Sequence, residues 1–144
     1  MYMLKVTVLV MMLLIPYVVL GQTQREMEQA ACDESKRADA DLNREYQQLL
    51  HQYRDDVRFI RNARRAQRAW IAYRDAQLAL LYPYAERRGA YGSVYPMCRC
   101  MAVLELTKER VEELRRWVDG VEEGDVCSGS IKIRNHVWSR KRSH

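Results

Sequence analysis

The sequence predicts an all-α protein, a small antiparallel bundle of about three helices cross-linked by disulfides. Apolar residues recur with the 3.6-residue period of a helix along most of the chain, and only Ser130 to Ile133 resembles a strand. Four cysteines in a chain of 144 residues are most simply paired into two disulfides in an exported protein. Setting aside the first 21 residues leaves 144 − 21 = 123, enough for one domain and too few for two.

The first 21 residues have the pattern of a signal peptide. Lys5 precedes an uncharged run from Val6 to Leu20, and Gly21 supplies the small residue that a signal peptidase reads. We expect cleavage near Gly21 and a periplasmic or secreted mature protein. The alternative is a retained membrane anchor, but 15 residues interrupted by Pro16 are fewer than the roughly 20 that span a bilayer.

The first helix of the domain is expected from about Gln24 to Tyr53. Its inward side is predicted to carry six residues: Cys32, Asp39, Leu42, Tyr46, Leu49 and Tyr53.

The second helix is expected from about Val57 to Leu81, where Pro83 ends it. Its predicted inward residues are Ile60, Ala63, Gln67, Ile71, Arg74 and Leu78. The first part of this helix carries five arginines, Arg58, Arg61, Arg64, Arg65 and Arg68. We interpret them as spread round the helix and mainly solvated.

Polar groups stand in the apolar stripes of both helices. If the chain turns near Arg54 to Asp56, facing residues have numbers that sum to about 111. Asp39 then faces Arg74, and Asn43 faces Gln67. Because buried polar groups need partners, we predict a polar ladder of these two pairs across the hairpin.

The third helix is expected from about Met97 to Val118, and Gly120 ends it. Its predicted inward residues are Cys100, Leu104, Val111, Leu114 and Val118. The connection from Tyr82 to Pro96 is the longest loop, and loops commonly carry binding surfaces. Its candidate contact residues are Tyr84, Arg87, Arg88, Tyr91 and Tyr95.

Helix geometry favours one pairing of the cysteines. In an up-down-up bundle Cys32 lies at the same end as the start of the third helix, and Cys100 shares the inward stripe there. We therefore predict a Cys32–Cys100 disulfide, which leaves Cys98 to pair with Cys127. The second bridge requires the chain after Val121 to run back along the third helix almost fully extended.

Neither a metal site nor a catalytic site is predicted. Cys98 and Cys100 could bind a soft metal, but a lone Cys-x-Cys lacks the second pair that zinc sites carry. No phosphate loop, nucleophile elbow or histidine beside an acid is found in the sequence. We expect no cofactor, and we expect that the protein is not an enzyme.

The chain is predicted to divide into a signal peptide at 1–21, a helical domain at 22–130 and a basic tail at 131–144. The tail has no acid and five basic residues: Lys132, Arg134, Arg140, Lys141 and Arg142. The remainder is near neutral, so a pI of about 9.1 describes the tail and does not predict nucleic-acid binding.

Several ordered motifs resemble a known family. They are Asp-x-x-Leu-Asn-x-x-Tyr from Asp39, Ala-Gln-Arg-Ala-Trp-x-x-Tyr-Arg-Asp from Ala66, Gly92-Ser93, and Leu-Thr-x-x-Arg-x-x-x-Leu from Leu106. From about Ala31 to Cys127 the chain resembles the LprI-like family of bacterial envelope proteins. The resemblance implies an all-helical, disulfide-bonded exported domain, with lysozyme inhibition as the activity.

Three functional classes follow from these observations. The first is a binding protein that inhibits a lysozyme or related cell-wall hydrolase through protein contact, although the sequence shows no acidic loop for a cationic hydrolase. The second is a non-inhibitory envelope module that binds another protein, or an anionic membrane or wall polymer through the tail. The third is a metal-handling protein that uses Cys98 and Cys100.

Overall fold

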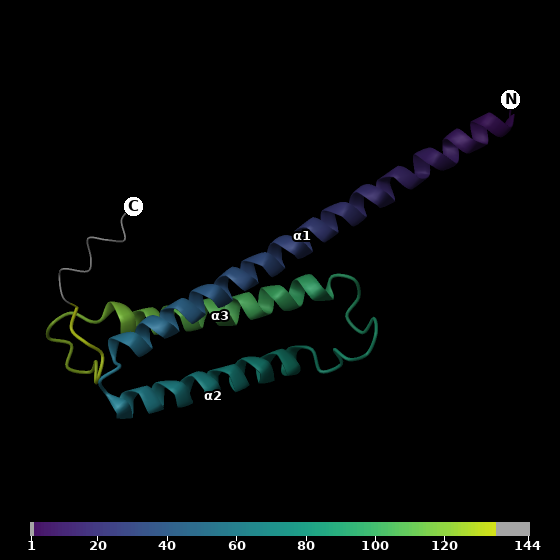
Figure 1. Ribbon diagram of the computed structural model, residues 1–144. Helices are drawn as coiled ribbons and strands as arrows, with labels where there is room; N and C mark the ends of the chain where they lie inside the picture. The colour runs from purple at the N-terminus through teal and green to yellow at the C-terminus, as the bar shows by residue number, and fades with distance from the viewer. Residues whose placement is uncertain (1, 135–144) are drawn as a thin grey trace.

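The computed structural model describes residues 2–134, with side chains described from Thr23 to Arg134. It contains three helices, α1 (Tyr2–Gln52), α2 (Val57–Leu81) and α3 (Tyr95–Asp119), in an up-down-up order (Figure 1). The all-α prediction is confirmed, and so are the bounds of α2. Helix α1 begins at Tyr2 instead of near Gln24, and it continues through Pro16 into the domain without a break.

The signal peptide expected at 1–21 lies outside the residues whose side chains are described. Among the described residues, no helix combines the length and the apolarity needed to cross a bilayer.

The core forms mainly between α1 and α3, which run parallel and pack along one another (Figure 1). The parallel register is fixed by the Cys32–Cys100 disulfide at one end and by an ion pair between Glu45 and Arg115 (3.5 Å) farther along. Between them, Lys108 donates to Glu34 at 2.7 Å, and this hydrogen bond lowers the pKa of the Glu34 carboxyl.

Buried residues recur at every third or fourth position along α1, as in a helix that packs lengthwise on a neighbour. Its buried residues are Ser35, Ala38, Leu42, Glu45 and Leu49, and the buried Tyr53 follows directly after the helix. The buried residues of α3 are Thr107, Val111 and Leu114. The predicted stripe of α1 is therefore partly wrong, because Asp39 is exposed and Tyr46 is only half-buried. Ala38 and Glu45 take the buried positions next to them.

Helix α2 packs on α3 more sparsely than α1 does, and Figure 1 shows it lying apart from the α1–α3 pair. It begins at Asp56, whose side chain accepts a hydrogen bond from the backbone N–H of Phe59 at 2.9 Å, a typical N-cap. Near this turn the Phe59 ring stacks on Tyr53, with centroids 3.9 Å apart, and lies 5.4 Å from Trp117. This aromatic cluster joins all three elements at one end of the bundle.

The chain after α3 returns to the same end. Val121 and Ile133 form a single parallel β-bridge. Within residues 2–134 the structure contains no β-strand beyond this bridge. The bridge depends on Gly120, whose φ is 75°, because a Cβ there would lie 2.5 Å from the carbonyl oxygen of Lys132. The expected strand from Ser130 to Ile133 is thus reduced to this single bridge.

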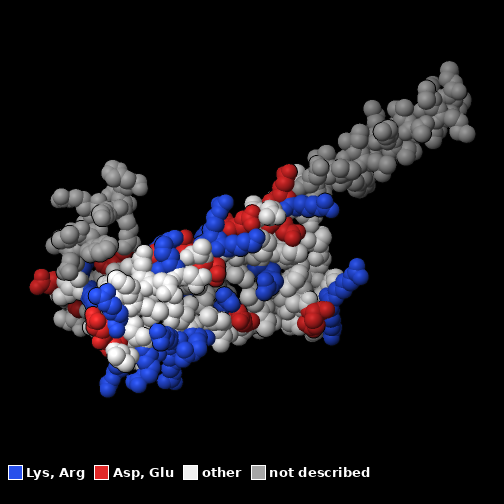
Figure 2. All heavy atoms as spheres, in the orientation of Figure 1, with Lys and Arg blue, Asp and Glu red and all other residues white. Residues whose placement is uncertain are grey.

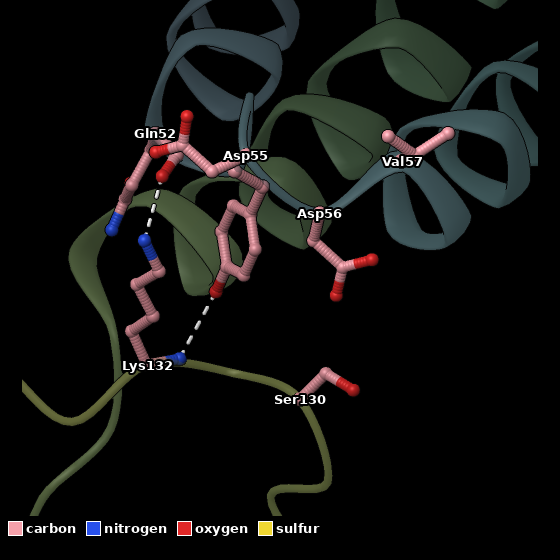
Figure 3. Close-up of a pocket in the computed structure, with 7 residues that line it drawn as sticks. Gln52, Asp55, Asp56, Val57, Ser130 and Lys132 are labelled. Carbon is pink, nitrogen blue, oxygen red and sulfur yellow. Dashed lines mark hydrogen bonds between the residues drawn. The ribbon is translucent and has the colours of Figure 1, made fainter.

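The first residues of the predicted basic tail contact the bundle. The backbone N–H of Lys132 donates to the Tyr53 hydroxyl at 3.0 Å, and its ammonium donates to the carbonyl oxygen of Gln52 at 2.6 Å (Figure 3). The same ammonium lies 4.7 Å from the centroid of the Tyr53 ring. Residues 131–134 therefore belong to the folded domain, and residues 135–144 lie outside the described residues.

Candidate functional site

The predicted polar ladder between α1 and α2 is wrong. Asn43 donates to Asp39 on its own helix at 3.3 Å, and both residues are exposed. Arg74 pairs with its neighbour Asp75 at 2.9 Å. The prediction assumed that helices adjacent in sequence pack most closely, whereas α3 provides the main contacts of both α1 and α2.

Gln67 nevertheless occupies a polar junction, and its partner comes from α3. The buried Gln67 carbonyl oxygen accepts hydrogen bonds from both Nε and Nη2 of Arg110 at 3.2 Å. The third nitrogen of the same guanidinium, Nη1, pairs with Glu113 at 2.7 Å. Arg110 and Arg74 lie 6.0 and 5.4 Å from the centroid of Trp70, within the range of cation–π attraction.

This junction gathers residues from two of the recognised motifs, Ala-Gln-Arg-Ala-Trp and Leu-Thr-x-x-Arg. Because Gln67 and Trp70 lie on α2 and Arg110 on α3, the two motifs meet where the helices meet. The arrangement pairs half-buried polar groups of α2 and α3 with one another. Its role is therefore to hold α2 on α3.

Two further buried polar groups were missed by the sequence reasoning. Glu45 lies in the α1–α3 core. Its Oε1 is 3.5 Å from Arg115 and 3.8 Å from Arg44, whereas its Oε2 has no hydrogen-bond partner. Thr107 is fully buried, and its hydroxyl is also without a partner. The three- and four-residue spacing of Leu42, Glu45 and Leu49 is the signal that could have placed Glu45 inside.

The Cys32–Cys100 disulfide is confirmed, whereas the predicted Cys98–Cys127 bridge is wrong: both thiols are free. Cys98 lies in the first turn of α3 and Cys127 follows its end, so most of the length of the helix, about 32 Å at 1.5 Å per residue, separates them. The chain after α3 turns toward Tyr53 and does not return along the helix. No cluster of three metal-ligating side chains is found among residues 23–134.

The connection between α2 and α3 is built on a cluster of three tyrosines. The rings of Tyr91 and Tyr95 lie edge-on to Tyr82, with centroids 5.2 and 5.0 Å from it, and are themselves 5.5 Å apart. The Tyr91 hydroxyl accepts a hydrogen bond from the backbone N–H of Tyr84 at 3.1 Å. Burial raises the pKa of Tyr82, and the neighbouring Cys98, Tyr95 and Tyr91 raise it further. The cluster fixes the shape of the connection.

The predicted contact residues of this connection therefore divide into two groups. Tyr91 and Tyr95 are half-buried in the cluster, whereas Tyr84, Arg87 and Arg88 are exposed. The Arg87 guanidinium lies over the Tyr84 ring, 4.4 Å from its centroid. Exposed apolar side chains flank this pair in sequence, and they are Leu80, Leu81 and Val94. The exposed surface thus combines an arginine, an aromatic ring and aliphatic groups.

An acidic loop is present at the other end of α3, contrary to the sequence reasoning. It follows the helix and exposes Glu122, Glu123 and Asp125. The carboxylate of Asp125 accepts a hydrogen bond from the backbone N–H of Cys127 at 3.1 Å. An open depression beside the loop also contains Arg115 and Arg134, so its charge is mixed.

The family model for the lysozyme inhibitor LprI matches residues 20–114. The chain belongs to the LprI family. The match includes most of α1, all of α2, the tyrosine-rich connection and α3 as far as Leu114. The acidic loop and the basic tail lie outside it. Since the family description names an inhibitor, it fits the expectation that the protein is not an enzyme.

One relative is an uncharacterized protein of Rhizobium meliloti (strain 1021). It is 32% identical over 111 residues, which make up 69% of this chain and 77% of the relative. No solved structure matches the chain.

Proposed function

We propose that this LprI-family protein is exported and inhibits a lysozyme or a related cell-wall hydrolase by direct protein contact. The observation that carries the proposal is the family match over residues 20–114, which includes the exposed connection between α2 and α3. Export is supported by the signal-like N-terminus and by the Cys32–Cys100 disulfide, since such bonds persist in oxidising compartments. We propose cleavage near Gly21 and a periplasmic or secreted location.

We place the contact on the connection, centred on Tyr84, Arg87 and Arg88. Tyrosine and arginine carry a large share of the binding energy in protein interfaces, and exposed leucines beside them add apolar area. The Tyr82–Tyr91–Tyr95 packing holds the loop in one shape before binding. A loop that is ordered in advance loses less conformational entropy when it binds.

The acidic loop complements a cationic hydrolase in charge, but we favour the connection. The acidic loop lies beyond residue 114, where the family match ends. Its acidic residues also line the same depression as Arg115 and Arg134, so the charge there is mixed.

The test is inhibition of purified lysozymes by the oxidised protein isolated after export. Replacing Tyr84, Arg87 and Arg88 by Ala should weaken inhibition by at least about tenfold, the size of effect expected from losing one strong interface residue. The control replaces Arg61 and Arg65 on α2 by Ala. It removes the same number of positive charges as the connection variant and should leave inhibition unchanged.

Full inhibition by the connection variant with an unchanged helical circular dichroism spectrum would remove the connection from the mechanism. Acidic-loop replacements, Glu122→Gln and Glu123→Gln, then identify the second surface. Absence of inhibition by the parent protein against several lysozymes would refute the inhibitor function itself.

A further inference from the structure

The solvent side of α2 carries a stripe of five arginines, Arg58, Arg61, Arg64, Arg65 and Arg68, here called the arginine stripe. All five are exposed, and α2 contains no acidic residue before Asp75. Figure 2 shows a dense group of basic side chains at the lower left, where Figure 1 places the first half of α2. This is a concentration of one sign of charge on an otherwise mixed surface.

The stripe occupies one side of the helix and is not spread around it. At 100° per residue, its five positions fall within an arc of about 120°. The buried residues Gln67 and Leu78 lie outside this arc, about 100–120° round the helix from its middle. Between Arg58 and Arg68 the stripe is about 15 Å long, at 1.5 Å per residue.

No ion pair or hydrogen bond joins the arginines of the stripe to a described residue, and what sets them apart from the other exposed arginines is that five of them lie together on one helix. Arg44, Arg110 and Arg115 each pair with a carboxylate, and Arg87 lies over an aromatic ring. Five guanidinium groups held close together without counter-charges repel one another. A polyanion bound along the stripe would relieve this repulsion.

The shape of the stripe indicates what kind of anion it fits. Between Arg58 and Arg68 the exposed residues other than the arginines are Asn62 and Ala66, and both are short. The stripe therefore has no exposed aromatic ring on which a base or sugar could stack. The two depressions described for the fold lie at the end of the bundle, near Tyr53 and Val121, and none of the five arginines lines them. A straight, flat row of guanidinium groups matches a flat plane of phosphates.

We propose that the arginine stripe docks this protein on an anionic phospholipid bilayer. Helix α2 would lie along the membrane surface, with the guanidinium groups at the depth of the lipid phosphates. The tyrosine-rich connection follows the far end of α2, 13 residues beyond Arg68, and would remain accessible to a protein partner. Membrane docking does not depend on inhibition, and either activity can exist without the other.

The experiment is cosedimentation of the exported, full-length mature protein with lipid vesicles. One set contains phosphatidylcholine alone, and in the other about a third of the lipid is phosphatidylglycerol, enough to give a negative surface potential. We expect binding to the anionic set only, weakening as salt is raised because the charges are screened.

The stripe variant carries Arg58→Gln, Arg61→Gln and Arg65→Gln, since glutamine keeps a similar helix propensity. Each arginine near an anionic surface adds roughly a fivefold gain in binding, so the variant should bind about a hundredfold more weakly. The matched control removes three exposed arginines elsewhere, Arg25→Gln, Arg37→Gln and Arg99→Gln. It has the same net charge and should bind like the parent.

Two further arms identify the source of any binding that is seen. A chain that ends after Arg134 should keep its vesicle binding, because it retains the stripe. Equal losses in the stripe variant and the control, loss only in the shortened chain, or binding to soluble polyphosphate without binding to vesicles would each overturn the proposal. Circular dichroism of every variant confirms that the helices are intact.

Discussion

Gln67 joins two helices through a single carbonyl oxygen, because both Nε and Nη2 of Arg110 donate to it. Gln67→Ala would leave a half-buried guanidinium with only Glu113 as a partner. We expect the free energy of unfolding to fall by about 1–3 kcal/mol, the usual cost of an unsatisfied buried polar group. Urea denaturation checks this, with the exposed Gln48→Ala on α1 as control. Equal stability of the two variants would show that the junction is not structural.

Thr107 is a buried residue whose hydroxyl has no hydrogen-bond partner. Thr107→Val keeps the shape of the side chain and removes the unsatisfied oxygen. We therefore expect this variant to be more stable than the parent, by about 1 kcal/mol. Thr107→Ala serves as the comparison, because it removes the oxygen but also leaves a cavity between α1 and α3. A loss of stability in Thr107→Val would mean that the hydroxyl has a partner in solution.

Tyr53 makes stability depend on pH at the alkaline end. Burial raises the pKa of its hydroxyl, with the N–H of Lys132 acting in the opposite direction. A raised pKa means that the folded state favours the neutral phenol. The stabilising contribution is complete below the unfolded pKa of about 10 and is lost as pH rises through the folded pKa.

Tyr53→Phe keeps the ring stacked on Phe59 and removes the ionisable group. At neutral pH it should cost about 1 kcal/mol, because the Lys132 N–H loses its acceptor. Above pH 10 the parent should lose stability more steeply than the variant, as denaturation curves at a series of pH values would show. Parallel pH profiles for the two proteins would contradict this assignment. Tyr82, whose pKa is also raised, remains in both.

At the scale of elements, the disulfide between α1 and α3 cross-links the two helices that share the core. Closing a loop with a sequence separation of 68 should stabilise the domain by about 4 kcal/mol in the chain-entropy picture. Replacing Cys32 and Cys100 together by Ser should therefore lower the free energy of unfolding by about this amount.

The two remaining cysteines predict a thiol count. The native protein should show two titratable thiols, with the exposed Cys127 reacting faster than the partly buried Cys98. Peptide mapping that finds Cys98 joined to Cys127 would refute this, because it would require α3 to unwind or the following segment to leave Tyr53.

The way the elements pack explains what could be predicted from the sequence. The helix period and the breakers Pro83 and Gly120 are local signals, so the three helices and the bounds of α2 were predictable. The Cys32–Cys100 disulfide was also predictable. In an up-down-up order, the part of α1 near Cys32 lies at the same end of the bundle as the start of α3. The partners of the polar residues were not predictable. Helical spacing indicates which side of a helix faces inward, but it does not indicate which neighbouring helix that side contacts.

Gln67 shows this distinction in one residue. Its position on the inward side of α2 was predicted and is confirmed, while its partner proved to be Arg110 on α3 and not Asn43 on α1. The free Cys98 has a similar origin. Pairing it with Cys127 followed from counting cysteines, whereas the fold uses the segment before Arg134 to cover Tyr53.

At the scale of the whole molecule, the bundle has two ends with different construction. At one end the Tyr82–Tyr91–Tyr95 cluster shapes the exposed connection, and at the other the returning chain closes over Tyr53. The arginine stripe runs along α2 between them. This separation allows binding at the connection and docking through the stripe to be removed independently by mutation.

The same arrangement predicts that residues 131–134 contribute to the stability of the fold and that the residues after Arg134 do not. A chain ending after Ser130 loses the two hydrogen bonds of Lys132 to Tyr53 and Gln52, as well as the Val121–Ile133 bridge. We expect its free energy of unfolding to fall by about 1–3 kcal/mol, as for other buried groups left without partners. A chain ending after Arg134 keeps all of these contacts and should be as stable as the parent. Urea denaturation of both truncated proteins distinguishes the two cases, and equal stability of all three chains would show that residues 131–134 do not contribute to the fold in solution.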